Sequence, residues 1–94
     1  MIRGFKDDRA RAIFEGAAPK KGFPSALAQI ARRKLNMLEA AHRLEDLRAP
    51  PANRLEKLVG NRKGQHSIRI NDQWRICFRW TAAGADDVKI VDYH

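Results

Sequence analysis

The periodicity of the apolar residues changes at Pro50 and Pro51, and this change constrains the fold more than any other feature of the sequence. Over residues 25–47, Leu, Ile and Ala recur at spacings near three and four, the pattern of one apolar stripe on a helix of about six turns. Over residues 66–80, in "HSIRI" and "WRICFRW", apolar residues recur at every second position, which is the pattern of strands. Two consecutive prolines cannot continue a helix. The sequence therefore predicts a helical first half and a sheet after the prolines.

Turn residues and helix-end signals place the other elements. The segment "KDDRARAIFEG" predicts a short helix, with Asp7 and Asp8 in its first turn and Gly16 at its end. The turn segments "GNRKG", "NDQ" and "TAAGAD" link predicted strands over residues 53–59, 66–70, 74–80 and 87–93. We expect an α+β architecture, with two N-terminal helices, the second one long, packed on one face of a twisted, mainly antiparallel β-sheet. The 94 residues suit a single domain, 1–94.

The balance of charge gives the first indication of function. Nineteen Lys and Arg against eleven Asp and Glu leave a net charge of +8 and a pI near 10.4. Such a surface attracts polyanions, and nucleic acid is the leading candidate. We expect no membrane association, because no apolar run reaches about 18 residues. Cys77 is the one cysteine, which is typical of a cytoplasmic protein.

Motifs for metal or cofactor binding are not found in the sequence. The three His and one Cys are dispersed, with no CxxC or HExxH motif, so we predict no metal site. The segment "VGNRKG" lacks the spacing and the ending of a nucleotide-binding loop, and we predict no cofactor.

Alternation along the strands places Arg69, Arg75 and Arg79 on the face opposite the Trp, Ile and Phe residues. An ordinary solvated face would explain any one of these arginines, but three of them on adjacent strands of a basic protein favour a surface for a single RNA strand. By the same parity His66 points with Ile68 toward the core, which favours a structural role for it over a catalytic one.

The closing residues Asp92, Tyr93 and His94 are expected to lie beside the strand that carries the arginines. A carboxylate, a phenol, an imidazole and a guanidinium can cut RNA without a metal ion: a base takes the proton of the 2′-OH, a cation stabilises the charged phosphorus, and an acid protonates the leaving oxygen. The terminal α-carboxylate beside the His94 imidazole should favour the imidazolium form, which can donate a proton.

The segment "PPANRLEKLVGNRKGQHSIRINDQWRICFRW", followed by "VDYH", resembles the HigB group of the RelE/ParE superfamily of bacterial toxins. The resemblance covers nearly the whole chain and implies a RelE-like fold. It also implies a toxin of a type II toxin–antitoxin system that enters the A site of the 70S ribosome and cleaves the mRNA there. The implied partner is a HigA-type helix-turn-helix antitoxin. The alternative within the same superfamily is a ParE-like inhibitor of DNA gyrase that acts by binding alone.

The resemblance also assigns roles to particular residues. Arg75 matches the family arginine that stabilises the scissile phosphate, and Asp92, Tyr93 and His94 match the C-terminal residues that act in catalysis or orient the mRNA. Many relatives carry a lysine in "LKG", or a histidine shortly before it, where this chain has Val59 and Glu56. Lys57, expected on the same strand face as Val59, is the candidate substitute. The basic residues expected to contact RNA or the ribosome are Lys57, Arg62, Lys63, Arg69 and Arg79.

Overall fold

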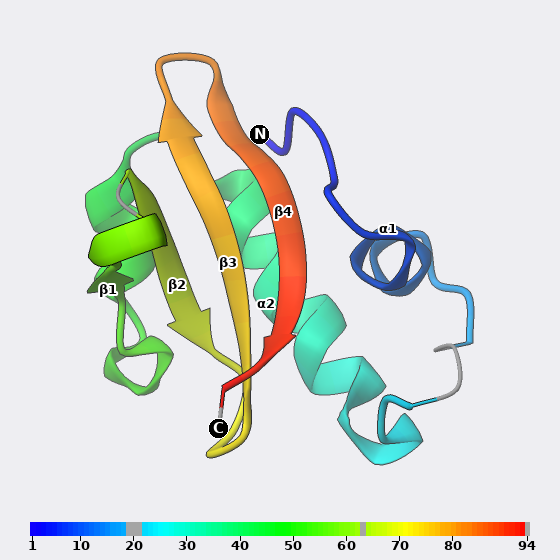
Figure 1. Ribbon diagram of the computed structural model, residues 1–94. Coiled ribbons are helices and arrows are strands. Elements are labelled where there is room, and N and C mark those ends of the chain that lie inside the picture. The colour runs from blue at the N-terminus through cyan, green and yellow to red at the C-terminus, as the bar shows by residue number, and fades with distance from the viewer. Residues whose placement is uncertain (19–21, 63, 94) are drawn as a thin grey trace.

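The protein is an α+β chain in which helices cover one face of an antiparallel sheet (Figure 1). The computed structural model describes residues 1–18, 22–62 and 64–93, with the side chain of Arg62 left out. The helices are α1 (Asp8–Phe14) and α2 (Ala28–Ala40), and short 3-10 turns are η1 (Ser25–Leu27), η2 (Leu44–Arg48), η3 (Pro51–Asn53) and η4 (Gly60–Arg62). The strands are β1 (Glu56–Lys57), β2 (Gln65–Arg69), β3 (Trp74–Thr81) and β4 (Gly84–Asp92), in the sheet order β1-β2-β3-β4.

Helix α1 forms where its end signals predict it. The Asp7 carboxylate caps the first turn by accepting the backbone N–H of Ala10 at 2.7 Å. Gly16 ends the segment with a φ of 86°, a conformation that suits glycine. The second oxygen of Asp7 accepts the backbone N–H of Ile90 on β4 at 3.1 Å. One side chain thus starts the helix and attaches it to the sheet.

The predicted helix over residues 25–47 is too long. Helix α2 ends at Ala40, and Ala41 is extended, with φ −68° and ψ 130°. The physical reason lies in Asp46, whose carboxylate accepts the backbone N–H groups of both His42 and Arg43 at 3.0 Å, and these bonds lower its pKa. Those N–H groups are therefore not available to a continuing helix. The apolar period continues past the break because Leu47 is buried in the core from turn η2.

The strands are also shorter or shifted relative to the prediction. The first predicted strand, 53–59, pairs only at Glu56–Lys57, and the last begins at Gly84 and ends at Asp92 instead of covering 87–93. Residues 1–6 run beside β4 (Figure 1), where isolated parallel bridges join Ile2 to Ala85 and Phe5 to Val88. The sheet is therefore antiparallel within its named strands, with a parallel segment along β4.

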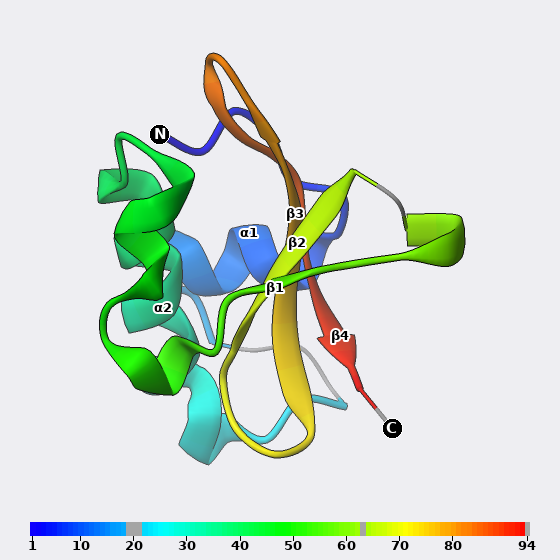
Figure 2. The same ribbon diagram turned by 90° about the vertical axis from the view of Figure 1, so that its left-hand side faces the viewer.

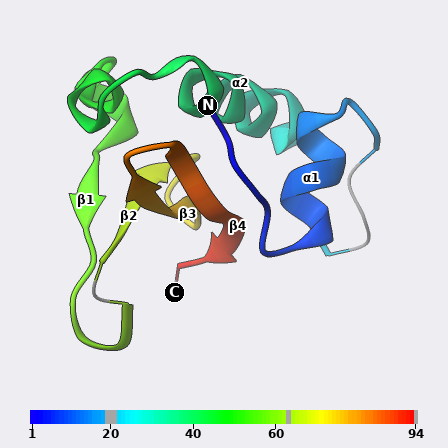
Figure 3. The same ribbon diagram turned by 90° about the horizontal axis from the view of Figure 1, so that it is seen from above.

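Strand parity separates the core from the opposite face. Residues Ile68, Ile76 and Phe78 are fully buried and pack with the helices. The register pairs Ser67 with Cys77 and Arg69 with Arg75, so these side chains share the other face. Figures 2 and 3 show that η4 and the C-terminal end of β4 lie on the side of the sheet away from α2. The face with the arginines is therefore partly enclosed.

Candidate active site

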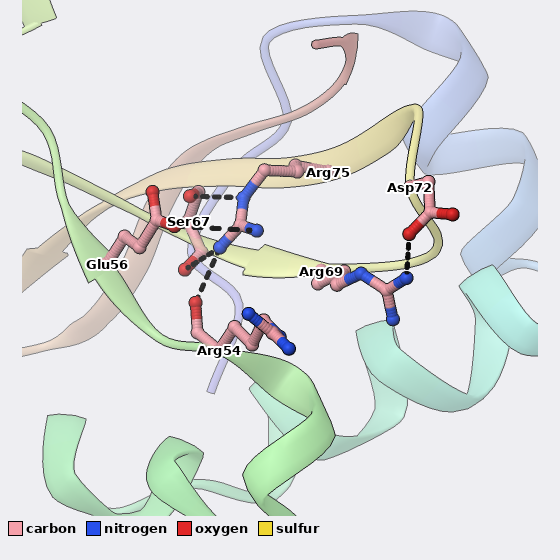
Figure 4. Close-up of polar contacts among 6 residues, drawn as sticks. All are labelled: Arg54, Glu56, Ser67, Arg69, Asp72 and Arg75. Atoms are coloured by element: carbon pink, nitrogen blue, oxygen red, sulfur yellow. Dashed lines mark hydrogen bonds and ion pairs between the residues drawn. The ribbon is translucent and has the colours of Figure 1, made fainter.

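Arg75 lies at the centre of the candidate site, and its side chain is only 7% exposed. Its Nε donates to Ser67 Oγ at 2.8 Å, and its Nη2 donates to the carbonyl oxygens of Arg54 at 2.5 Å and Ser67 at 3.3 Å (Figure 4). Its Nη1 lies 3.8 Å from Glu56 Oε1. Since a guanidinium has five N–H groups, three are used to fix its position and the Nη1 pair is directed toward Glu56.

The Arg54 carbonyl is set by a buried polar cluster beneath it. Asn53 is fully buried, and its amide donates to the carbonyl oxygens of Leu47 at 3.1 Å and Ala49 at 3.4 Å. Its oxygen accepts from Lys34 Nζ on α2 at 2.5 Å. Arg54 then adopts a left-handed conformation, with φ 43°, that closes turn η3. Helix α2 therefore holds, through Asn53, the backbone that binds Arg75.

A pocket of about 290 Å³ opens beside Arg75. It is lined by Arg54, Glu56, Arg69, Asn71, Asp72, Arg75 and Tyr93. The lining carries three guanidinium groups and two carboxylates, and Arg69 forms an ion pair with Asp72 in the turn between β2 and β3. The pocket is suited to an anion such as phosphate.

The chain after β4 is held against the turn before β3. The backbone N–H of Tyr93 donates to the Gln73 carbonyl at 2.6 Å, and the Arg75 guanidinium lies 5.5 Å from the centre of the Tyr93 ring. Asp92 is paired with Trp74 in the register, and its carboxylate accepts from the Gln73 amide at 3.0 Å. Tyr93 thus lines the pocket, whereas Asp92 contacts Gln73. His94 lies outside the described residues.

The basic residues predicted to bind RNA or the ribosome occupy different surroundings. Arg69 lines the pocket with Arg75. Arg79 shares their sheet face, but it lies further along β3 and forms an ion pair with Asp87 at 3.2 Å. Lys63 and the side chain of Arg62 lie outside the description.

The expectation that Lys57 could replace a basic group near Val59 does not fit the register. Lys57 pairs with His66, and Glu56 pairs with Ser67. Paired residues share a face, so Glu56 joins Ser67 and Arg75, and Lys57 points to the opposite face. The structure places a carboxylate beside Arg75 where the sequence suggested a lysine.

His66 is a core-side residue, as its parity predicted. Its ring stacks on Phe78 with centroids 6.1 Å apart, and no described residue forms a hydrogen bond with its buried Nδ1. Burial, and to a lesser extent the charge of Lys57, lower the pKa of His66. The described residues contain no group of three or more His, Cys, Asp or Glu side chains that could hold a metal ion.

Sequence reasoning missed four of the pocket residues, Arg54, Glu56, Asn71 and Asp72, as members of the site. Asn71 and Asp72 belong to the "NDQ" turn, which was predicted as a turn without a role in the site. Glu56 was visible as a departure from the family pattern. Arg54 gave no signal, because its place depends on the buried Asn53 and a left-handed backbone.

Comparison with known proteins decides the family. The family model described as RelE-like toxin of type II toxin–antitoxin system HigB matches residues 3–94. The chain belongs to this HigB-like toxin family. The toxin is 43% identical over 80 residues to Toxin HigB-1 of Vibrio cholerae, covering 85% of this chain and 84% of the relative. It is also 28% identical over 94 residues to Endoribonuclease HigB of Proteus vulgaris, covering 100% of both chains.

A third relative, an uncharacterized protein of Haemophilus influenzae, is 36% identical over 76 residues, covering 81% of this chain and 75% of the relative. Membership of a type II toxin–antitoxin family gives the toxin an antitoxin partner. In the described parts of the chain, the helices are too short or too polar to cross a membrane.

Proposed function

We propose that this toxin cuts mRNA in the A site of the 70S ribosome, through attack of a 2′-OH on the adjacent phosphate and without a metal ion. Endoribonuclease activity rests on family membership and on the full-length similarity to Endoribonuclease HigB. The observation that carries the mechanism is the buried Arg75 guanidinium, which lines the pocket, is held by Ser67 and Arg54, and has Nη1 3.8 Å from Glu56. A pre-positioned cation of this kind stabilises charge that develops in the transition state.

The pocket supplies a candidate for each step of the reaction. Arg75 stabilises the pentacoordinate phosphorus as the 2′-oxygen forms a bond to it and the bond to the 5′-oxygen breaks. Glu56, whose side chain is 51% exposed and 3.8 Å from Arg75, takes the proton of the 2′-OH. Tyr93 and His94 supply the proton for the leaving 5′-oxygen. The products are a 2′,3′-cyclic phosphate and a 5′-hydroxyl end.

Asp92 acts in this scheme as a positioning residue. Its carboxylate binds the Gln73 amide, and the neighbouring Tyr93 N–H binds the Gln73 carbonyl. These two bonds hold the chain that carries Tyr93 along the pocket. We assign Lys57 and Arg79, which do not line the pocket, and also Arg62 and Lys63, to contacts with ribosomal phosphates, consistent with the net charge of +8. The partner is a HigA-type helix-turn-helix antitoxin, and the toxin works in the cytoplasm with the ribosomes.

The test uses 70S ribosomes programmed with a defined mRNA and single-turnover cleavage by the toxin. A 2′-deoxy sugar at the scissile nucleotide should block cutting, and the native mRNA should give a 2′,3′-cyclic phosphate end. Glu56→Gln should slow cleavage, because an amide cannot take the proton of the 2′-OH. Intact mRNA together with gyrase-dependent DNA damage would indicate the ParE-like alternative and overturn the proposal.

A further inference from the structure

The arginines of the pocket differ in how many donors they can offer. Arg75 uses three N–H groups on the protein, so it presents Nη1 to one phosphate. Arg69 is its direct cross-strand partner, with a side chain that is 31% exposed, and both line the same pocket as Arg54 (Figure 4). Cross-strand partners have Cα atoms roughly 4.5–5.5 Å apart. The pocket therefore holds cations for more than one phosphate.

Lys34 of helix α2 lies near enough to Arg69 for the two positive charges to interact. Lys34 is buried and fixed to Asn53, and burial, with the charges of Arg33 and Arg69, lowers the pKa of its ammonium group. Because these positive charges repel one another, binding of an anion near them is favourable. The carboxylate that faces Arg69 is Asp72, on the turn between β2 and β3.

Asp72 is poorly placed to be a permanent counter-ion, because its side chain is 98% exposed. An exposed ion pair stabilises a protein by about 0–1 kcal/mol, since water solvates both groups well. An incoming phosphate, by contrast, can bind two guanidinium groups at once and use the fork geometry of arginine. Exchange of Asp72 for a phosphate on Arg69 should therefore be favourable.

We propose that Arg54 and Arg69 form a second phosphate subsite that binds the phosphodiester group next to the scissile one, and that Asp72 is the carboxylate this phosphate displaces. The inference rests on the proposed function, in which Arg75 binds the scissile phosphate, and it extends the pocket to a two-phosphate site. A second phosphate subsite would make the pocket bind a continuous RNA strand more tightly than an isolated phosphate.

The decisive experiment measures the Kd of the toxin for 70S ribosomes carrying an uncleavable mRNA with a 2′-deoxy scissile nucleotide. An uncharged methylphosphonate replaces the scissile phosphate, one of its two neighbours, or a distant phosphate. Neutralising one neighbour should weaken binding by about tenfold, as expected for lost hydrogen bonds to a charged group. In Arg69→Gln and Arg54→Gln toxins, the same neutralisation should have an effect within about twofold. Equal losses in the variants and the native toxin would overturn the subsite.

Asp72→Asn tests the displaced carboxylate, and Asp87→Asn, which releases Arg79 outside the pocket, is the matched control. Asp72→Asn should bind native mRNA severalfold more tightly and lose this gain when the neighbouring phosphate is neutral. Any change in the Kd of Asp87→Asn should be the same for native mRNA and for mRNA with the neutral neighbouring phosphate. A gain in Asp72→Asn that survives neutralisation would contradict the displacement.

The salt dependence gives a second readout. The slope of log Kd against log salt should fall by about 0.7 in Arg69→Gln, the value for one phosphate contact with a single strand. An unchanged slope would count against the subsite. The scissile methylphosphonate and Arg75→Ala report on the proposed function separately, so failure of the subsite and failure of the cleavage mechanism can be told apart.

Discussion

Arg75 and Arg79 lie four positions apart on the same face of β3, yet their surroundings differ sharply. Arg75 is buried, held by a hydroxyl and two backbone carbonyl oxygens, and has the Tyr93 ring against it. Arg79 is half exposed and paired with the carboxylate of Asp87. Strand parity alone makes these two residues equivalent.

The difference arises from what lies over each end of β3. At the Arg75 end, the chain around β1 and the residues after β4 close over the strand, so the guanidinium is fixed before any ligand arrives. At the Arg79 end, the guanidinium is half exposed and is paired with Asp87. A fixed cation can favour a transition state over a ground state, whereas a mobile surface cation contributes mainly to association. Under the proposed function, Arg75 therefore serves the chemical step and Arg79 serves association with the ribosome.

The largest effect is expected from removing Arg75, and the same change at Arg79 is its comparison. Arg75→Ala should lower the rate of mRNA cleavage on saturating ribosomes by about 10²–10³-fold, the loss typical of removing a pre-positioned donor. Arg79→Ala should leave that rate within about threefold and act on the ribosome concentration needed for saturation. Single-turnover cleavage over a range of ribosome concentrations measures both. Comparable losses of the saturated rate would break the distinction.

The second largest effect is expected from Asn53, whose hydrogen bonds hold the backbone that binds Arg75. Asn53→Ala leaves Lys34 and two carbonyl oxygens without the amide they bind, so the free energy of unfolding should fall by about 1–3 kcal/mol. The saturated cleavage rate should fall as well, because the Arg54 carbonyl loses its support. Denaturant unfolding and cleavage assays measure the two effects. Asn61→Ala, at an exposed position, is the control and should change the unfolding free energy by at most about 0.5 kcal/mol.

The aromatic ring over Arg75 should give a smaller effect. Tyr93→Leu should be less stable than Tyr93→Phe by about 0.5–1 kcal/mol, because only phenylalanine keeps a π face against the guanidinium. Both variants lack the phenol, so a cleavage rate that is equally low in both would assign the rate to the hydroxyl group. Equal stabilities, measured by denaturant unfolding, would show that the ring does not help to hold Arg75.

The smallest effect concerns the opposite, core face of the sheet. The pKa of His66 is lowered in the fold, so the unfolded chain binds more protons between that pKa and 6.5. The unfolding free energy should therefore fall as the pH drops through this window, and His66→Phe should flatten the fall while leaving cleavage unchanged. Asp46, with a pKa lowered from 3.8, contributes in a separate window below that value. A large loss of cleavage in His66→Phe would place chemistry on the core face.

Much of the fold could be predicted from the sequence, because periodicity reports directly on which face is buried. The alternation in β2 and β3 correctly separated Ile68, Ile76 and Phe78 from Arg69 and Arg75. The extent of α2 was wrong for a specific reason: Leu47 reaches the core from a separate 3-10 turn, so the apolar stripe continues where the backbone does not.

The details of the site depended on contacts between distant residues. Parity predicted that Arg75 shares a face with Arg69, but not that it is buried. That burial follows from the pairing of Glu56 with Ser67 and from the left-handed turn at Arg54, neither of which has a local signature. The same pairing turns Lys57 away from the pocket and places a carboxylate beside Arg75.

The bond from the Asp7 carboxylate to Ile90 joins residues 83 positions apart. Closing a loop of that length costs about 4 kcal/mol of chain entropy by the logarithmic rule, so this contact forms late unless the sheet has already brought the two segments together. In the folded protein β4 pairs with β3 on one side and bridges to residues 1–6 on the other, so its docking joins both ends of the chain to the sheet. Tyr93 follows Ile90 by three residues, so the strand that binds the cap of the first helix is also the strand that brings Tyr93 to the pocket.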